Sequence, residues 1–262
     1  MPEVLQWRAA NQPSEVAFTF LVDGEDETLS FTYAELDREA RAIAAALARL
    51  APRGTRALLV FDSGLDYIAA LYGCLYAGIV AVPVYPPDPF RIDRTLPRLQ
   101  SIVADAQAEL LLATEATLSW AEALFRSVPG LKSLVATDTL ARTQPARRVD
   151  QPKIKSDDLA ILQYTSGSTG APRGVVIAHA NLTANLRRIE RTIDREGVVA
   201  VLWLPAYHDM GLIGGIFLPV FAGRRIILMS PVSFMQRPLR WLKAISNYRG
   251  WTTAAPNFAY DL

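Results

Sequence analysis

The sequence predicts an α/β protein in which layered, mostly parallel sheets are flanked by helices. Short apolar runs alternate with amphipathic or apolar helical runs along most of the 262 residues, a pattern typical of parallel strands covered on both faces. Hydrophobic residues make up 51% of the chain and charged residues 20%, which is enough apolar material for a large core. A glycine- and hydroxyl-rich stretch, YTSGSTGAPRGVV (164–176), interrupts two of the best strand-like runs.

The first quarter of the chain predicts a short amphipathic segment, a hairpin and a long helix. The segment VLQWRAANQ comes first. Strand-like runs at 16–22 and 28–33 flank DGEDE, whose Asp-Gly start favours a β-hairpin. Apolar residues then recur every three or four positions over 34–50 opposite a charged face, which predicts a helix that Pro52 and Gly54 end.

The rest of the chain repeats strand and helix. Before the glycine-rich stretch we expect strands at 56–61, 80–84, 109–114 and 133–137, and helices at 65–77, 94–107 and 118–127. A polar, proline-containing segment without periodicity, 141–158, predicts an exposed connection. Beyond it we expect strands at 159–164, 174–178, 199–205, 224–229 and 251–256, and helices at 180–193, 212–221 and 238–248.

Composition excludes several classes of protein. A formal net charge of +1 gives no reason to expect nucleic acid as a partner. The single cysteine, Cys74, rules out an internal disulfide and is expected to be buried. Residues 67–85 lack charge, but Gly78 and Pro83 interrupt them, so a helix and a strand are favoured over a membrane span. The first residues, MPEVLQWRAA, do not resemble a signal peptide, and we expect a cytoplasmic location.

The stretch 164–176 has the chemistry of a phosphate-binding loop. Glycines allow backbone N–H groups to converge on an anion, hydroxyls add donors, and a cation neutralises charge. The spacing fits neither a Walker A loop nor a nucleophile elbow. On these features alone a flexible surface loop is an equally good interpretation. The candidate phosphate-binding residues are Thr165, Ser166, Gly167, Ser168, Thr169, Gly170 and Arg173.

The complete string YTSGSTGAPRGV resembles the phosphate loop of the adenylate-forming superfamily, which includes acyl-CoA synthetases, luciferases, adenylation domains and fatty acyl-AMP ligases. The resemblance implies that the loop wraps the β- and γ-phosphates of ATP, with Mg²⁺ accompanying the nucleotide. Many members carry lysine where this chain has Arg173. The charge is kept, but a compact ammonium is replaced by a planar guanidinium fork.

A second segment, LWLPAYHDMGLIGGIFLPVFAG (202–223), resembles the corresponding segment of fatty acyl-AMP ligases. The resemblance implies that His208 borders and gates an acyl pocket, together with Asp209, Met210 and Gly211. A structural histidine is the alternative for His208. Asp209 could pair with a substrate ammonium, as in amino-acid adenylation domains, or bond to backbone or to His208, and the sequence leaves this open.

The last segment, TTAAPNFAYDL (252–262), resembles the strand-to-helix junction that lines the acyl pocket in the same family. Proline is favoured in the first turn of a helix, so Pro256 is expected to start one whose first turn faces the pocket. The residues implied are Pro256, Asn257 and Phe258, and ordinary helix capping is the alternative.

The resemblance implies a function and a place within a larger enzyme. Residues 1–262 resemble the first part of the large N-terminal AMP-binding domain. The adenine and ribose motifs and the C-terminal domain with its catalytic lysine would follow, so no catalytic residue and no metal ligand is assigned here, and the chain alone is expected to be inactive. The implied reaction is ATP-dependent activation of a fatty acid to acyl-adenylate, for transfer to the phosphopantetheine arm of an acyl carrier protein, as in fatty acid metabolism or polyketide synthesis. An acyl-CoA ligase, an amino-acid adenylation domain and a non-catalytic module remain alternatives.

Overall fold

The computed structural model describes residues 1–87, 89–143, 153–166, 172–193 and 197–262. These residues form two compact units, each built around one sheet. The first unit comprises Met1–Asp37, Asp62–Ile68 and Thr183–Leu262, and the second comprises Arg38–Phe61 and Ala69–Leu182. The predicted α/β class with mostly parallel sheets is confirmed.

The second unit holds a six-stranded sheet in the order β6-β5-β3-β4-β7-β8. Neighbouring strands are parallel except for the antiparallel pair β7–β8. The strands are β3 (Arg56–Val60), β4 (Val80–Val84), β5 (Leu110–Ala113), β6 (Ser133–Ala136), β7 (Leu159–Ser166) and β8 (Pro172–Ala178).

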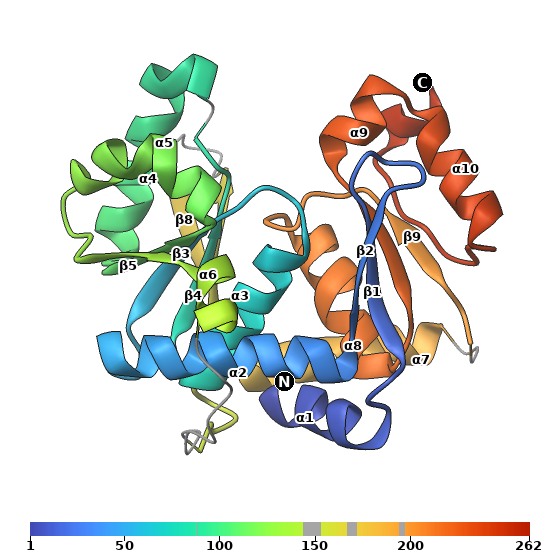
Figure 1. The fold of residues 1–262 in the computed structure, drawn as a ribbon, viewed down its shortest axis with the longest axis horizontal. Helices are drawn as coiled ribbons and strands as arrows, with labels where there is room; N and C mark the ends of the chain where they lie inside the picture. The colour runs from blue at the N-terminus through green and yellow to red at the C-terminus, as the bar shows by residue number, and fades with distance from the viewer. Residues whose placement is uncertain (88, 144–152, 167–171, 194–196) are drawn as a thin grey trace. The chain divides into compact units, whose positions relative to one another are not determined.

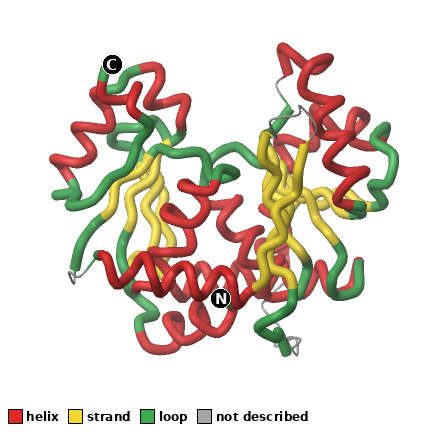
Figure 2. Tube along the Cα trace, turned by 180° about the vertical axis from the view of Figure 1, so that it is seen from behind, coloured by secondary structure: helices red, strands yellow, loops and turns green. Residues whose placement is uncertain are grey.

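Helices lie on both faces of this sheet. The helical elements of this unit are α2 (Tyr33–Leu50), α3 (Leu65–Ala77), α4 (Ile92–Ala106), α5 (Glu115–Arg126) and α6 (Thr137–Thr143), with a 3-10 turn, η1, at Pro89–Arg91. Part of α2, part of α3 and most of α7 (His179–Thr192) belong to the first unit. Figures 1 and 2 show α4 and α5 on one side of the strands and α3 on the other. Leu58 and Val60 of β3 pack with Val103 of α4 and Phe125 of α5 in one buried cluster. Alternate residues of each strand therefore serve opposite faces.

The uncharged region near residue 70 is a buried helix followed by a buried strand. Tyr72, Cys74 and Tyr76 of α3 are completely buried, and every residue of β4 is buried. Such all-round apolarity belongs to elements enclosed between layers. The prediction that Cys74 is buried is confirmed, and burial raises the pKa of its thiol. Within the described ranges, no helix combines the length and apolarity that crossing a membrane requires.

The first unit holds a four-stranded sheet in the order β2-β1-β10-β9. Its strands are β1 (Val16–Leu21), β2 (Thr28–Thr32), β9 (Ala200–Leu202) and β10 (Ile226–Met229). The predicted β1–β2 hairpin is confirmed, and the other pairs are parallel. The helical elements are α1 (Pro2–Asn11), the π-helix η2 (Met210–Phe217), α8 (Leu218–Ala222), α9 (Pro231–Gln236), α10 (Leu239–Asn247) and the 3-10 turn η3 (Asn257–Tyr260).

An aromatic cluster forms part of the core of this unit. The Trp203 ring stacks on Phe234 with centroids 3.9 Å apart, and Trp241 meets Trp203 edge-on at 6.3 Å. Aromatic pairs of this geometry add about 0.5–1.5 kcal/mol each beyond the burial of their area. They attach α9 and α10 to the chain that leaves β9.

The predicted strand at 251–256 is wrong. The structure has only an isolated bridge between Ala200 and Thr252. Backbone bonds join only its first two residues to the chain at β9: the Trp251 N–H donates to the Val199 carbonyl at 2.9 Å, and the Val201 N–H donates to the Thr252 carbonyl at 3.0 Å. The next acceptor, the Val201 carbonyl, is taken by a side chain. The Thr253 hydroxyl donates to the Val201 carbonyl at 2.6 Å and accepts from the Trp241 indole N–H at 2.9 Å. Local side-chain hydrogen bonds of this kind compete with a strand ladder.

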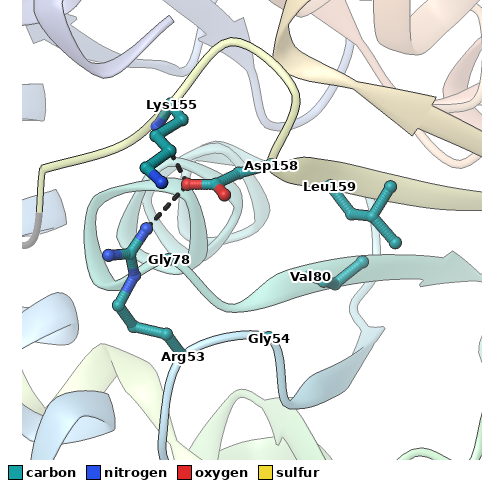
Figure 3. Close-up of a pocket in the computed structure, with 7 residues that line it drawn as sticks. All are labelled: Arg53, Gly54, Gly78, Val80, Lys155, Asp158 and Leu159. Atoms are coloured by element: carbon teal, nitrogen blue, oxygen red, sulfur yellow. Dashed lines mark hydrogen bonds and ion pairs between the residues drawn. The ribbon is translucent and has the colours of Figure 1, made fainter.

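The predicted connection at 141–158 is described only in part. Its first residues belong to α6, and residues 153–158 contain neither helix nor strand. Asp158, at the end of this segment, accepts from the Arg53 guanidinium at 2.6 Å and from the Lys155 backbone N–H at 2.9 Å. Figure 3 shows these groups converging beside an open pocket of about 360 Å³. The contacts fix the residues that enter β7.

The Asp158 contacts predict an acid-sensitive contribution to stability. The Lys155 N–H, and then the Arg53 charge, hold the pKa of Asp158 below its usual range. The contribution is therefore present above the unfolded pKa of about 3.9 and is lost as the pH falls through the lower folded pKa. We expect Asp158→Asn to lower the urea midpoint at about pH 6, and this difference to shrink as the pH falls below about 3.9. Asp157→Asn is the control, since that carboxylate makes no hydrogen bond or ion pair in the described part of the chain; an equal shift for both variants would contradict the assignment.

Candidate functional site

The described members of the predicted phosphate-binding set, Thr165, Ser166 and Arg173, lie in the last two residue pairs of the β7–β8 hairpin. The last paired residues are Thr165 with Arg173 and Ser166 with Pro172. Both strands therefore continue two residues further toward 167–171 than the sequence pattern predicts. Gly167, Ser168, Thr169 and Gly170 lie outside the described residues.

Arg173 carries its charge at the end of a fixed strand. Its side chain is exposed and makes no hydrogen bond or ion pair with any residue that the structure describes. Thr165, its cross-strand partner, is also exposed. The backbone of both residues is set by the ladder, while the guanidinium and hydroxyl remain available to an anion.

Two residues outside the predicted site, Tyr164 and Asp105, join the hairpin to α4 two residues before the end of β7. The Tyr164 hydroxyl donates to the Asp105 carboxylate of α4 at 2.5 Å, and the Tyr164 ring lies against Gly174 of β8. A glycine inside a strand often marks such a close approach, so Gly174 was the available signal. Nothing in the local sequence identifies Asp105.

The predicted acyl-site residues His208–Gly211 lie in the first unit, where the chain enters η2. A π-helix is rare and frequently lies at functional sites. The turn into it is tight: the His208 N–H donates to the Pro205 carbonyl at 3.1 Å, and the Leu212 N–H donates to the His208 carbonyl at 2.8 Å. A Cβ on Gly211 would overlap the Pro205 carbonyl oxygen. The absence of a side chain at Gly211 therefore allows the backbone of η2 to lie this close to Pro205.

The structure brings His208 and Asp209 together. Asp209 Oδ1 lies 2.5 Å from His208 Nδ1 and accepts from the Met210 N–H at 2.7 Å. Both side chains are 65% exposed. Of the alternatives that the sequence leaves open for Asp209, the structure therefore contains both the bond to His208 and the bond to backbone. Met210 is 45% exposed.

The predicted residues near the C-terminal segment form the start of η3. Pro256 precedes the turn with φ −63° and ψ 156°, and no side chain caps it. Asn257 is exposed. Phe258 is 48% exposed and meets the Trp203 ring edge-on at 6.1 Å. The predicted helix start at Pro256 is confirmed as a 3-10 turn, and helix capping by the Asn257 side chain is not observed.

An apolar cavity of about 160 Å³ lies in the same unit, beside η2. It is lined by Gly214 and Leu218, by Ala200 and Leu202 of β9, and by the 252–254 segment. Arg224 and Arg225 also line it. Gly214 has no atom within 4 Å of the position a Cβ would take. The cavity has the apolar lining that an aliphatic chain requires.

The candidate residues contain no metal centre of their own. In the part of the chain that the structure describes, no group of three or more His, Cys, Asp or Glu side chains is arranged to hold a metal ion. The phosphate-loop candidates belong to the second unit, and the residues around His208 and Phe258 belong to the first.

Comparison with known families matches residues 5–262 to the AMP-binding enzyme model. The chain belongs to the AMP-binding enzyme family. The match includes the phosphate-loop hairpin and the segment around His208, and it confirms the predicted resemblance of the chain to this family.

Relatives in this family are fatty-acid ligases. The medium-chain-fatty-acid–[acyl-carrier-protein] ligase JamA of Moorena producens is 43% identical, with 99% of this chain and 44% of the relative aligned. The long-chain-fatty-acid–AMP ligase FadD23 of Mycobacterium tuberculosis is 37% identical, with 100% and 46% aligned. This chain spans about half the length of the curated relatives it matches.

Solved members of the family have the same fold. The fatty acid AMP ligase from Legionella pneumophila superposes with a TM-score of 0.89 at 38% identity, over 99% of this chain and 44% of that one. A fatty acyl-adenylate ligase from L. pneumophila, solved in complex with acyl adenylate and pyrophosphate, gives 0.85 at 39% identity over the same shares. The family is therefore enzymatic, and a member has been seen with an adenylate.

The close approach at Gly211 predicts that replacing a glycine of η2 by alanine destabilises the protein much more at residue 211 than at residue 214. We expect Gly211→Ala to destabilise the protein by about 1–3 kcal/mol, because the added methyl meets backbone that cannot move away. Gly214→Ala is the matched control, since open space receives its methyl, and its effect should stay within about 1 kcal/mol. Urea denaturation followed by circular dichroism measures both; equal effects would show that the Pro205 contact does not constrain η2.

Proposed function

We propose that this chain supplies the phosphate-binding and acyl-binding parts of a fatty acyl-AMP ligase. The observation that carries the proposal is the match of residues 5–262 to the AMP-binding family, with fatty-acid ligases among the relatives. In the proposed reaction a fatty-acid carboxylate oxygen bonds to the α-phosphorus of ATP, and the bond to the pyrophosphate leaving group breaks. Acyl-adenylate and pyrophosphate are the products.

Arg173 and Thr165 are proposed to bind the phosphates that leave as pyrophosphate. The exposed guanidinium near the start of β8 supports this role, because no described residue bonds it and its planar fork suits charge-assisted bonds to two phosphate oxygens. Gly167, Ser168, Thr169 and Gly170 are proposed to add backbone and hydroxyl donors. Mg²⁺ would arrive with ATP and be held mainly by phosphate oxygens and water, as is usual for this ion.

The acyl group is proposed to occupy the first unit. The apolar cavity beside η2 suits a hydrocarbon tail, and Met210, Phe258 and the exposed His208–Asp209 pair are proposed to border its carboxyl end. Pro256 and Asn257 are proposed to shape the same border. Asp209 is already bonded to His208 and to the Met210 N–H, which argues against its use as a partner for a substrate ammonium.

A carrier-protein thiol is proposed as the acceptor of the acyl group. The phosphopantetheine sulfur would bond to the acyl carbon, and AMP would leave. The support is the acceptor in the name of JamA, at 43% identity. Coenzyme A is the second candidate, favoured by relatives such as the putative fatty-acid–CoA ligase FadD21 of M. tuberculosis, at 38% identity.

The proposal predicts acyl-adenylate formation and a specific dependence on Arg173. The full-length protein, given ATP, Mg²⁺ and a fatty acid, should release acyl-AMP detectable by mass spectrometry. Loss of one charge-assisted phosphate contact, about 1.5–3 kcal/mol, should raise the ATP KM of Arg173→Ala roughly ten- to a hundredfold. The fatty-acid KM should not change.

Arg188→Ala is the control, since that exposed arginine of α7 makes no hydrogen bond or ion pair in the described ranges. Activation of amino acids with fatty acids inert would overturn the substrate class. An unchanged ATP KM in Arg173→Ala would overturn the role of the arginine.

The position of Gly214 beside the cavity predicts that the size of residue 214 limits the length of the fatty acid that binds. Gly214→Leu should project a side chain into the cavity and displace about two methylenes, which corresponds to roughly a tenfold rise in the KM for dodecanoate. The KM for ATP should stay constant, and the KM for a short acid such as butyrate should rise much less. Gly214→Ala is the control. An equal loss for short and long acids would show that the tail does not lie there.

A further inference from the structure

We propose that Tyr164 is a positioning residue: bonded to Asp105 and seated on Gly174, it holds the β7–β8 hairpin against α4 and thereby places Arg173 for the phosphates of ATP. The inference rests on the proposed function. It adds three residues, Tyr164, Asp105 and Gly174, for which neither the family match nor the relatives' names give a role.

The hydroxyl contact joins two elements that are distant in sequence. Tyr164 lies near the end of β7, and Asp105 lies in the last turn of α4, 59 residues away. The O–H donates to Asp105 Oδ2 at 2.5 Å, the short end of the range for a hydroxyl bonded to a carboxylate. Burial, and then this bond, raise the pKa of Tyr164 far above its ordinary value. The hydroxyl therefore keeps its proton, and remains a donor, throughout the neutral range.

The ring contact explains the glycine that follows Arg173. Gly174 is the cross-strand partner of Tyr164. A Cβ at residue 174 would lie 3.0 Å from Cζ and 3.1 Å from the hydroxyl oxygen of Tyr164. A larger residue would therefore require the ring and its hydroxyl to shift by a few tenths of an ångström. An aromatic ring laid over a cross-strand glycine is a known way to fix the register of an edge strand.

The contacts of Tyr164 with Asp105 and Gly174, together called the anchor, act on Arg173 through its neighbour Gly174. The ring packs on the buried cluster that includes Leu99, Ile102 and Val103 of α4, and α4 also contacts β8. β8 is the edge strand of the six-stranded sheet in the described residues, so it has a strand on one side only. Gly174 is held beneath the ring, and Arg173 is the next residue toward the loop. Loss of the anchor would let the strand end and its guanidinium shift relative to the rest of the sheet.

The test compares variants that separate the hydroxyl, its acceptor and the ring seat, using the full-length protein. Tyr164→Phe keeps the ring and removes the bond. We expect a rise of roughly five- to tenfold in ATP KM, the effect of losing about one hydrogen bond, with an unchanged fatty-acid KM. Asp105→Asn retains an oxygen that can accept and should stay near wild type, whereas Asp105→Ala should match Tyr164→Phe. The double variant Tyr164→Phe with Asp105→Ala should be no worse than either single variant, because both remove one interaction.

Gly174→Ala should raise the ATP KM in the same selective way, because its methyl displaces the ring. If Tyr164→Phe unfolds the protein, the Asp105→Asn and Asp105→Ala pair still decides the question. An unchanged ATP KM in both Tyr164→Phe and Asp105→Ala would overturn the inference. Equal rises in the KM for ATP and for fatty acid would also overturn it, since they indicate a purely structural contact.

Arg173→Ala separates this inference from the proposed function. If Arg173→Ala raises the ATP KM while Tyr164→Phe and Asp105→Ala do not, only the positioning role fails. If Arg173→Ala has no effect on the ATP KM, the proposed phosphate contact fails, and the positioning role fails with it.

Discussion

The antiparallel pairing of β7 with β8 is the constraint on which the phosphate-loop region depends. All other neighbours in the six-stranded sheet run parallel. β7 lies between β4, which is parallel to it, and β8, which is antiparallel. The ladder runs from Leu159 with Ala178 to Ser166 with Pro172. Because a hairpin has a fixed register, the pairing fixes the backbone of Thr165, Ser166 and Arg173, the described candidates for phosphate binding. The Asp158 contacts hold the opposite end of β7.

In the first unit, a sharp turn of the backbone rather than a hairpin positions the candidate residues. The chain must turn sharply after β9 and return as a helix. Pro205 and Gly211 make this possible, because the absence of a Cβ at 211 lets the π-helix press against the Pro205 carbonyl. The same turn places His208 and Asp209 side by side at an exposed corner. The shape of the backbone and the pairing of the two polar side chains thus have a common cause.

Much of this arrangement could be predicted from sequence. The helix at 65–77 and the strand at 80–84 were predicted with the bounds that the structure has, because their apolar runs end at clear turn signals. The π-helix could not be predicted, since its apolar pattern is the same as that of an α-helix. The segment 251–256 looks like a strand by composition, but the bonds of Thr253 to Val201 and Trp241 depend on the tertiary structure. The Tyr164–Asp105 bond is invisible for the same reason, because periodicity within one element says nothing about a partner 59 residues away.

The presence of arginine rather than lysine at residue 173 has a physical meaning in this setting. The Cα of Arg173 is fixed by its pairing with Thr165, and the side chain beyond it is exposed. A lysine there would present three donors on a flexible stem that could adapt to many phosphate positions. A guanidinium presents donors in one plane, and two parallel bonds form only if the stem starts from the right place. Phosphate binding by a planar cation therefore depends more on a firmly held strand than phosphate binding by an ammonium does. In this protein the contact proposed to hold the start of β8 is the Tyr164 ring over Gly174.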